Sequence, residues 1–258
     1  LIILFKFSSI LRGFSMHNHG DYRDFKQIGA DSIHLWVIAL DDTPCSLEEY
    51  RSILSIQERE QGERFNFPEL QRRYIIAHAR LREILAAYIG IEPISVDFTT
   101  NAYDKPFLVK HPGQPDIHFN LSHSLEIAVI GIANSRRIGV DVEWVKPRKD
   151  HMKIAGRYFS PGEIATLKRK KNEHSNQAFI QLWVGKEAFI KARGDGMSLP
   201  LNQFELEGLI DHPGKKGCKI ELPVDKNPWF VYPIKLITGY LGAVAIEGEI
   251  RDAQYFKG

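Results

Sequence analysis

Cysteine is scarce in this chain, which has Cys45 and Cys218 far apart and in neither a CxxC nor a Cys/His spacing. The sequence therefore supports neither a disulfide framework nor a zinc site, and we expect a reducing, cytoplasmic environment. A membrane helix needs roughly 20 consecutive apolar residues, and no such run is present. We therefore expect no association with a membrane.

Charge of one sign is not in excess either. The 34 basic and 32 acidic residues leave a formal net charge of +2. A chain so near to balance carries no general electrostatic signature of nucleic-acid binding, so nucleic acid is not an expected partner. With 43% hydrophobic residues, the composition is that of an ordinary soluble protein with a substantial core.

The first 30 residues differ from the rest of the chain. Residues 1–5 are apolar, but Lys6 interrupts them, and neither a preceding basic region nor a small-residue cleavage site indicates a signal peptide. The sequence begins with Leu, and Met16 is a candidate natural start. We interpret residues 1–30 as an N-terminal extension, expected to be poorly ordered, and leave it out of the fold prediction.

The remaining sequence falls into two halves with a similar order of elements. Ser-x-x-Glu capping boxes predict helix starts at Ser46, Ser55 and Ser160. Long helices are expected at residues 71–89 and 176–193. Strands are expected at 33–39, 95–99, 116–121, 127–133 and 138–143, and then near 204–207, 219–222, 230–235 and 243–249.

This order predicts an α+β fold of two pseudo-symmetric lobes, residues 31–145 and 146–258. Each lobe is expected to be a small, mostly antiparallel sheet packed on helices, with the active site in the cleft between the lobes. One chain can complete such a cleft by itself, so a monomer is expected.

Three carboxylates carry the chemistry that the sequence predicts. Asp141 and Glu143 lie in Gly-Val-Asp-Val-Glu-Trp at 139–144, where a strand would place both acids on one face and Val140 and Val142 on the other. Glu187 lies in Trp-Val-Gly-Lys-Glu-Ala-Phe-Ile-Lys at 183–191, where helical spacing places it on one face with Lys191. Hard carboxylate oxygens beside an ammonium would suit Mg²⁺ holding a diphosphate.

Two further motifs accompany the motifs at 139–144 and 183–191. Asn-Leu-Ser-His-Ser occupies 120–124, and Tyr-Asp-Lys-Pro occupies 103–106. Over about residues 31–250, the four motifs together resemble the Sfp-type 4′-phosphopantetheinyl transferases. The family's pattern has Gly-x-Asp-x-Glu, Trp-x-x-Lys-Glu-Ala-x-x-Lys, Asn-x-Ser-His and Gly-Lys-Pro. This chain departs from the pattern in the Gly-Lys-Pro motif, where Asp104 takes the place of Gly.

The resemblance implies two pseudo-symmetric α+β lobes with coenzyme A in the cleft. Members of this family move the phosphopantetheine arm of coenzyme A to a serine of an apo acyl or peptidyl carrier protein and release adenosine 3′,5′-bisphosphate. Mg²⁺ is their usual metal. Coenzyme A and carrier proteins of fatty-acid, polyketide or nonribosomal peptide synthesis are therefore the expected partners.

The resemblance also assigns roles to the acids and to two lysines. Asp141, Glu143 and Glu187 would hold Mg²⁺, with Asp141 counted among the catalytic residues. Glu187 would also be the general base, either directly or through a water that it orients. Lys191 would contact the diphosphate and offset charge on the leaving bisphosphate. Lys186 would either reach a phosphate from the rim of the cleft or be solvated.

The nucleotide end of coenzyme A has its own set of candidates. Ser122 and His123 match the family's contacts to the 3′-phosphate, and Lys105 has motif support for a phosphate contact. Arg73 would either contact the nucleotide from the start of the first long helix or be solvated. Some family members carry lysines where this chain has Glu58 and Gln61, and Arg59 or Arg64 would be the substitutes here.

Two other functions fit part of the pattern. A Mg²⁺-dependent nuclease or phosphohydrolase also gathers acids and lysines, but Glu143 is not followed by Lys at the second position, as a nuclease strand would require. A coenzyme A-binding module without catalysis would be expected to lose one of the three acids. For an acidic carrier domain, the basic run at 168–171 and the helix opening at Ser160 are the hypothetical docking face.

Overall fold

The computed structural model describes residues 28–170, 172–206, 208–211 and 217–258. Residues 1–27 of the expected N-terminal extension lie outside this part of the chain. The helices are α1 (Leu47–Ser52), α2 (Ile56–Glu63), α3 (Pro68–Ile89), α4 (His151–Tyr158), α5 (Pro161–Arg169), α6 (Asn172–Arg193) and α7 (Gly208–Asp211). The strands are β1 (Ser32–Ala39), β2 (Phe98–Thr100), β3 (Pro106–Leu108), β4 (Ile117–Ser124), β5 (Ile127–Asn134), β6 (Ile138–Trp144), β7 (Cys218–Ile220), β8 (Trp229–Ile234), β9 (Tyr240–Glu247) and β10 (Asp252–Lys257).

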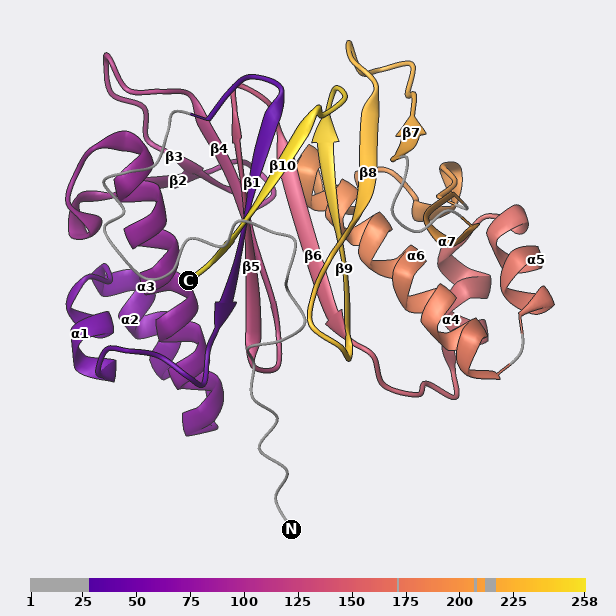
Figure 1. Cartoon of the computed structure of the whole chain (residues 1–258), viewed down its shortest axis with the longest axis horizontal. Coiled ribbons are helices and arrows are strands. Elements are labelled where there is room, and N and C mark those ends of the chain that lie inside the picture. The colour runs from indigo at the N-terminus through magenta and orange to yellow at the C-terminus, as the bar shows by residue number, and fades with distance from the viewer. Residues whose placement is uncertain (1–27, 171, 207, 212–216) are drawn as a thin grey trace.

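Two four-stranded sheets stand face to face between two groups of helices (Figure 1). The first sheet has the order β10-β1-β5-β4, and α1, α2 and α3 lie on its outer side. The second has the order β6-β9-β8-β7, with α4, α5 and α6 on the opposite flank of the molecule. The predicted α+β fold with two lobes is therefore confirmed.

Three hydrophobic cores correspond to these layers. Ile33 and Leu35 of β1 face the second sheet, whereas Trp36 and Ile38 pack toward α3, as the two-residue period of a strand requires. Val140 and Val142 of β6 also enter the core between the sheets. The third core fills the space between the second sheet and α6, so the side chains of β6 that point away from Val140 face this helix.

The three predicted capping boxes are all present. The side chains of Ser46, Ser55 and Ser160 each accept the amide of a glutamate three residues later, and that glutamate binds the serine amide in return. The α3 helix begins at Pro68, three residues before the predicted start, because Pro is well suited to the first turn. Arg73 therefore lies in the second turn of α3 and not at its N-terminus.

Strand pairing crosses the predicted lobe boundary at residue 145 twice, once by a strand before the boundary and once by a strand after it. β6 pairs antiparallel with β9 and belongs to the second sheet. β10 returns to the first sheet, where it pairs parallel with β1, although no strand was predicted there. The expected strand near 204–207 is not found in its described residues, 204–206, which follow a short 3₁₀ helix at Leu201–Gln203. No helix within the described ranges is both long and apolar enough to cross a membrane.

Candidate active site

The two sheets meet where the edge strand β4 lies beside the edge strand β6. Side chains of β4 bind β6 directly: the Val140 amide donates to Asn120 Oδ1 at 2.8 Å, and the Trp144 amide donates to Ser124 Oγ at 3.0 Å. Asn120, Ser122 and Ser124 alternate along β4 and so share one face. These contacts fix the register between the two lobes at the position of the predicted acids.

Gly139 lets α6 lie directly on β6. A Cβ atom at this position would stand 2.2 Å from the carbonyl oxygen of Ala188 and 2.3 Å from the amide nitrogen of Ala192. Both distances are far below a van der Waals contact, so any larger residue would push the helix away. The glycine therefore brings the α6 face that carries Glu187 and Lys191 to the strand face that carries Asp141.

Lys191, Asp141 and Ser122 form a closed triangle. Lys191 Nζ donates to Asp141 Oδ1 at 2.6 Å and to Ser122 Oγ at 3.0 Å, and Ser122 Oγ donates to the same carboxylate oxygen at 2.9 Å. Asp141 is buried, with 6% of its surface exposed, whereas the Lys191 side chain is 32% exposed. Three elements, β4, β6 and α6, thus converge on one polar cluster that solvent reaches from the lysine side.

Glu143 and Glu187 lie within electrostatic range of this cluster and of each other. Burial first, and then the charge of Asp141, raise the pKa of Glu143, and a 3.4 Å hydrogen bond from Ser124 Oγ opposes this. Burial and the charge of Asp141 also raise the pKa of Glu187, with Glu143 adding to the effect and Lys191 opposing it. Three half-buried or buried carboxylates therefore repel one another around a single ammonium.

This donor set fits a hard cation. Carboxylate oxygens are the ligands that Mg²⁺ takes, and a cation between these acids would relieve the repulsion that raises two of their pKa values. In the conformation described, no three acidic, histidine or cysteine side chains of the described residues converge closely enough to hold a metal. Asp141 Oδ1 is instead occupied by Lys191 and Ser122, so metal binding would require rearrangement of these side chains.

Family models match both halves of the chain. The 4′-phosphopantetheinyl transferase superfamily matches residues 137–245, and the model described as 4′-phosphopantetheinyl transferase, N-terminal, matches residues 41–135. The 4′-phosphopantetheinyl transferase Sfp of Bacillus subtilis strain 168 is 33% identical over 206 residues, which cover 79% of this chain and 88% of Sfp. The chain belongs to the Sfp-type 4′-phosphopantetheinyl transferases.

Two further relatives extend this similarity. The 4′-phosphopantetheinyl transferase HetI of Nostoc sp. strain PCC 7120 is 36% identical over 186 residues, covering 72% of this chain and 78% of HetI. A 4′-phosphopantetheinyl transferase of Bacillus subtilis is 36% identical over 193 residues, covering 74% of this chain and 82% of the relative. The superfamily match begins immediately before β6, so the boundary between the two matched models coincides with the junction of the sheets.

In this transferase, His123 and Arg73 lie on the first-lobe side of the cluster. Desolvation first, and then the charges of Lys191 and Arg73, lower the pKa of His123, whereas Asp141 raises it. Arg73 binds both carboxylate oxygens of Asp41, at 2.9 and 2.5 Å, and also Glu69 at 2.6 Å. The lowered pKa favours the neutral imidazole of His123, and the charge of Arg73 is already paired.

Lys105 lies apart from the acids. Its ammonium donates to the carbonyl oxygens of Ala192 at 2.8 Å and Ile138 at 3.2 Å. Burial, and then the charge of Arg137, lower the pKa of Lys105 to about 8. These contacts join Lys105 to the start of β6 and to the C-terminal end of α6.

Lys186 is also remote from the acids, on the opposite side of α6. It is fully buried, and its ammonium binds Glu163 Oε2 at 2.9 Å and the carbonyl oxygens of Leu201 and Phe204 at 2.7 and 2.8 Å. Neither a rim contact with phosphate nor a solvated side chain agrees with this position. The angle of about 100° between neighbouring helix positions, which separates Lys186 from Glu187, carries it into the core of the second lobe.

The candidate substitutes Arg59 and Arg64 have local partners, and so does Glu58, where some family members carry a lysine. Glu58 binds Arg82 Nε at 2.7 Å. Arg59 donates to the carbonyl oxygen of Leu54, and Arg64 donates to Gln61 Oε1. These contacts hold α2 and its connections together within the first lobe.

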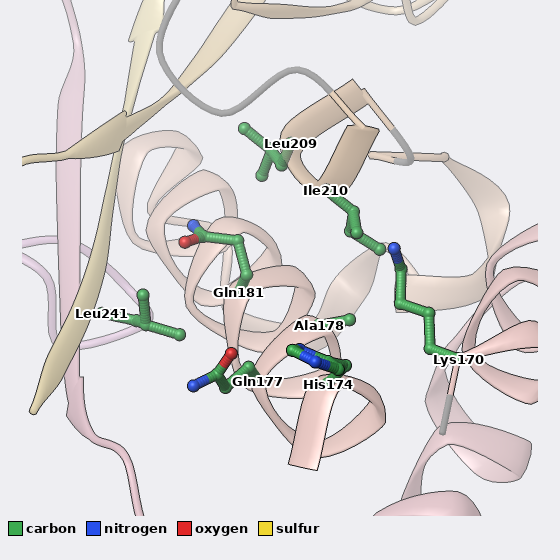
Figure 2. A pocket seen from close by; sticks show the side chains of 8 residues that line it. All are labelled: Lys170, His174, Gln177, Ala178, Gln181, Leu209, Ile210 and Leu241. Atoms are coloured by element: carbon green, nitrogen blue, oxygen red, sulfur yellow. The ribbon is translucent and has the colours of Figure 1, made fainter. Parts of the chain in front are cut away.

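A separate cavity of about 270 Å³ lies between α6, α7 and β9 (Figure 2). Lys170 and His174 stand on one side of it, and Leu209, Ile210 and Leu241 contribute apolar surface. Its α6 residues are on the N-terminal half of the helix, before the segment that carries Glu187. This cavity is therefore distinct from the acidic cluster.

Asn120 and Ser124 are the residues at the junction that the sequence prediction did not assign. Their signal is the alternation of Asn, Ser and Ser with other residues along the strand, which predicts a polar face but not its partner. Aromatic residues at helical spacing usually pack between elements, and Trp183 and Phe189 of the 183–191 motif do so. Phe189 is fully buried, and the half-buried Trp183 packs on Phe179 and Tyr158.

Proposed function

We propose that this protein transfers the 4′-phosphopantetheine arm of coenzyme A to a serine of an apo acyl or peptidyl carrier protein and releases adenosine 3′,5′-bisphosphate. Membership of the family supports the reaction class. The observation that carries the proposal for this chain is the triangle of Lys191, Asp141 and Ser122, flanked by Glu143 and Glu187 where the two lobes meet.

Asp141, Glu143 and Glu187 would be the residues that hold Mg²⁺. The carboxylate donor set and the mutual repulsion of the acids support this assignment. When bound, the ion would neutralise charge on the diphosphate of coenzyme A.

The acceptor serine must lose its hydroxyl proton as its oxygen attacks the β-phosphorus. A new phosphorus–oxygen bond forms, the bond from the β-phosphorus to the bridging oxygen breaks, and its electrons leave with the bisphosphate. Glu187 is the proposed acceptor of the proton, directly or through an ordered water. Its raised pKa supports this role, because a carboxylate whose pKa lies closer to neutral pH is a stronger base.

Lys191 would offset the charge that develops on the leaving bisphosphate. For this it must exchange its bond to Asp141 for one to phosphate, and its partial exposure supports such an exchange. Ser122 and His123 are proposed contacts for the 3′-phosphate. A phosphate dianion would favour the charged imidazole of His123, reversing the effect of Lys191 and Arg73 on its pKa.

Mass spectrometry of an apo carrier protein incubated with coenzyme A and Mg²⁺ tests the proposed reaction. We expect the carrier to gain the mass of one phosphopantetheine arm, and the gain to disappear when its acceptor serine is replaced by alanine. Cleavage of phosphodiesters without transfer to any of several carriers would instead favour a nuclease or phosphohydrolase.

The basic C-terminal end of α5, together with Lys170 directly after it, is the proposed docking face for an acidic carrier. Lys168 and Arg169 are exposed there, and Lys170 stands beside the cavity in Figure 2. Lys171, the last residue of the predicted run, lies outside the described residues. Charge reversal at Lys168 and Lys170 should raise KM for the carrier at low salt, since exposed charges act mainly on encounter. Unchanged kinetics would exclude this face.

Both cysteines are free in the structure, which supports a proposed location in the reducing cytoplasm. Because β4, β6 and α6 of one chain supply all the proposed site residues, we propose that a monomer is sufficient for activity. Sedimentation of the active protein at assay concentration would test this.

A further inference from the structure

The loop between β2 and β3 reaches from the first lobe to the C-terminal end of α6. The Asn101 side-chain amide donates to the carbonyl oxygen of Gly194 at 2.5 Å, and Lys105 Nζ donates to that of Ala192 at 2.8 Å. The last carbonyl groups of a helix have no partner within the helix, and a cation there also complements the helix dipole. Two side chains of the first lobe therefore cap a helix of the second.

The same ammonium also binds the strand that carries the acids. Lys105 Nζ donates to the carbonyl oxygen of Ile138, at the first residue of β6, at 3.2 Å. Ile138 lies three residues before Asp141, and Ala192 directly follows Lys191. One half-buried lysine thus joins the first residue of the strand that positions Asp141 to the C-terminal end of the helix that positions Lys191.

The loop is shaped for this contact by its own hydrogen bonds. Asn101 Oδ1 accepts the amides of Tyr103 and Lys105, both at 3.0 Å. Asp104 has a φ of 59°, in the left-handed region, which accounts for the glycine at this place in the family's pattern. The loop is therefore ordered by its own contacts as well as by those to α6.

Gly194 completes the fit on the side of the helix. It ends α6 with a φ of 75°, and a Cβ atom here would lie 2.5 Å from Lys105 Cδ. A larger residue would thus both strain the backbone and displace the lysine. Both partners are adapted to close contact between the loop and the helix end.

We propose that Asn101 and Lys105 are positioning residues of the transfer reaction: together they clamp the ends of β6 and α6 so that Lys191 and Glu187 keep their orientation toward Asp141. This inference rests on the proposed function. It assigns Lys105 to the alignment of the two lobes and not to a phosphate of coenzyme A.

The test compares Lys105→Met and Asn101→Ala with the wild type and with Lys110→Met. Lys110 is an exposed lysine of the same lobe that pairs with Asp116 and lies outside the site. For both clamp variants we expect kcat of carrier modification to fall by about 10²-fold, because small displacements of reacting groups are that costly. KM for coenzyme A should change by less than about twofold, since no ligand contact is removed. Lys110→Met should match the wild type.

Amide hydrogen exchange at the end of α6, residues 190–194, supplies a readout that does not depend on activity. We expect faster exchange there in both variants, with unchanged exchange in α3 as the internal reference. If Lys105→Met proves too unstable to measure, Asn101→Ala carries both readouts by itself.

The proposed clamp would be refuted if Lys105→Met raised KM for coenzyme A at unchanged kcat while Asn101→Ala had wild-type kinetics. This result would favour a contact between Lys105 and a phosphate of coenzyme A. Unchanged kinetics and exchange in both variants would overturn the clamp as well. A wild-type protein that transfers nothing would refute the proposed function, whereas the exchange measurement would still decide whether the loop holds α6.

Discussion

Two lysine–carboxylate pairs lie five positions apart on α6, and they differ in almost every physical respect. Lys186 and Glu163 form a pair with both side chains 0% exposed. Lys191 and Asp141 form a closer pair, at 2.6 Å, but the lysine side chain is 32% exposed. The same residue types in one short motif thus produce a sealed ion pair on one side of the helix and an accessible one on the other.

Saturation of the hydrogen bonds explains the difference. Lys186 has three hydrogen-bonding protons and three oxygen partners, from Glu163, Leu201 and Phe204. Glu163 in turn accepts the amides of Ser160 and Leu206. This network has no capacity left for a ligand, so it can only hold α5 and the 201–206 segment against α6.

The pair on the other face leaves charge uncompensated. Glu143 and Glu187 add two carboxylates to the single ammonium of Lys191, and burial, followed by the charge of Asp141, raises the pKa of both acids. A cluster in this state gains free energy from an added cation or from a proton. The comparison therefore predicts that changes on the Lys191 face act on chemistry, whereas changes on the Lys186 face act on stability.

Glu187→Gln should have the largest effect on chemistry. Removal of a general base typically costs about 10²–10⁴-fold, and the isosteric amide keeps the shape of the side chain. We expect kcat to fall in this range in a mass-spectrometric assay of carrier modification, with the thermal unfolding midpoint unchanged or slightly raised because one repelling charge is gone. Activity within a few-fold of the wild type would show that another group takes the proton.

Lys186→Met should act on the stability of the protein, because it breaks the buried ion pair. It leaves Glu163 charged and unpaired in the core, which typically destabilises a protein by about 3–5 kcal/mol. We expect a loss of this size in the free energy of unfolding, measured with urea. The double variant Lys186→Met with Glu163→Gln should recover much of it, because neither charge remains and the glutamine can still accept the Leu206 amide. A double variant no more stable than the single one would argue against the charge as the cause.

Local pattern was sufficient to predict which side each acid takes. The alternation of Val140 and Val142 with Asp141 and Glu143 required one apolar and one polar face, and the structure has both. Capping boxes predicted helix starts for the same reason, since their hydrogen bonds span only three residues. Features that depend on neighbours in sequence could therefore be predicted.

Features that depend on distant segments could not. Lys186 is buried because α5 and residues 201–206 close over it, and nothing in its own motif indicates those partners. The return of β10 to β1 joins residues about 220 positions apart along the chain, and such pairing leaves no local signal. For the same reason, the sequence suggested a phosphate contact for Lys105, whereas its carbonyl partners lie on β6 and α6.

Ser122→Ala tests how far the Lys191–Asp141 pair depends on the hydroxyl group that contacts both side chains. The hydroxyl donates to Asp141 and accepts from Lys191, but these two remain bonded to each other without it. We expect a loss of about 1 kcal/mol in unfolding free energy, the usual contribution of a hydrogen bond. Because Ser122 is also a proposed ligand contact, KM for coenzyme A should rise. Dephospho-coenzyme A, which lacks the 3′-phosphate, is the control substrate. If Ser122 contacts the 3′-phosphate, the variant and the wild type should have the same KM for this substrate.

The smallest effect should come from Mg²⁺ alone, and it should depend on pH. Burial and neighbouring charges raise the folded-state pKa of Glu143 and Glu187 above the ordinary value of 4.5. Their protonation therefore stabilises the folded protein fully below pH 4.5, and this stability is lost as the pH rises through the folded-state pKa values. Above that window the acids are charged and repel one another, which is the state that a cation stabilises.

We therefore expect Mg²⁺ at about ten times its Kd to raise the unfolding midpoint by about 2–4 °C at pH 7.5 and by much less near pH 4.5. Differential scanning calorimetry with and without EDTA would measure both values. Glu143→Gln should reduce the shift at pH 7.5, whereas Lys110→Met, remote from the acids, should leave it intact. A shift of equal size at both pH values would place the ion elsewhere, because only a site made of titrating carboxylates loses its affinity over this range.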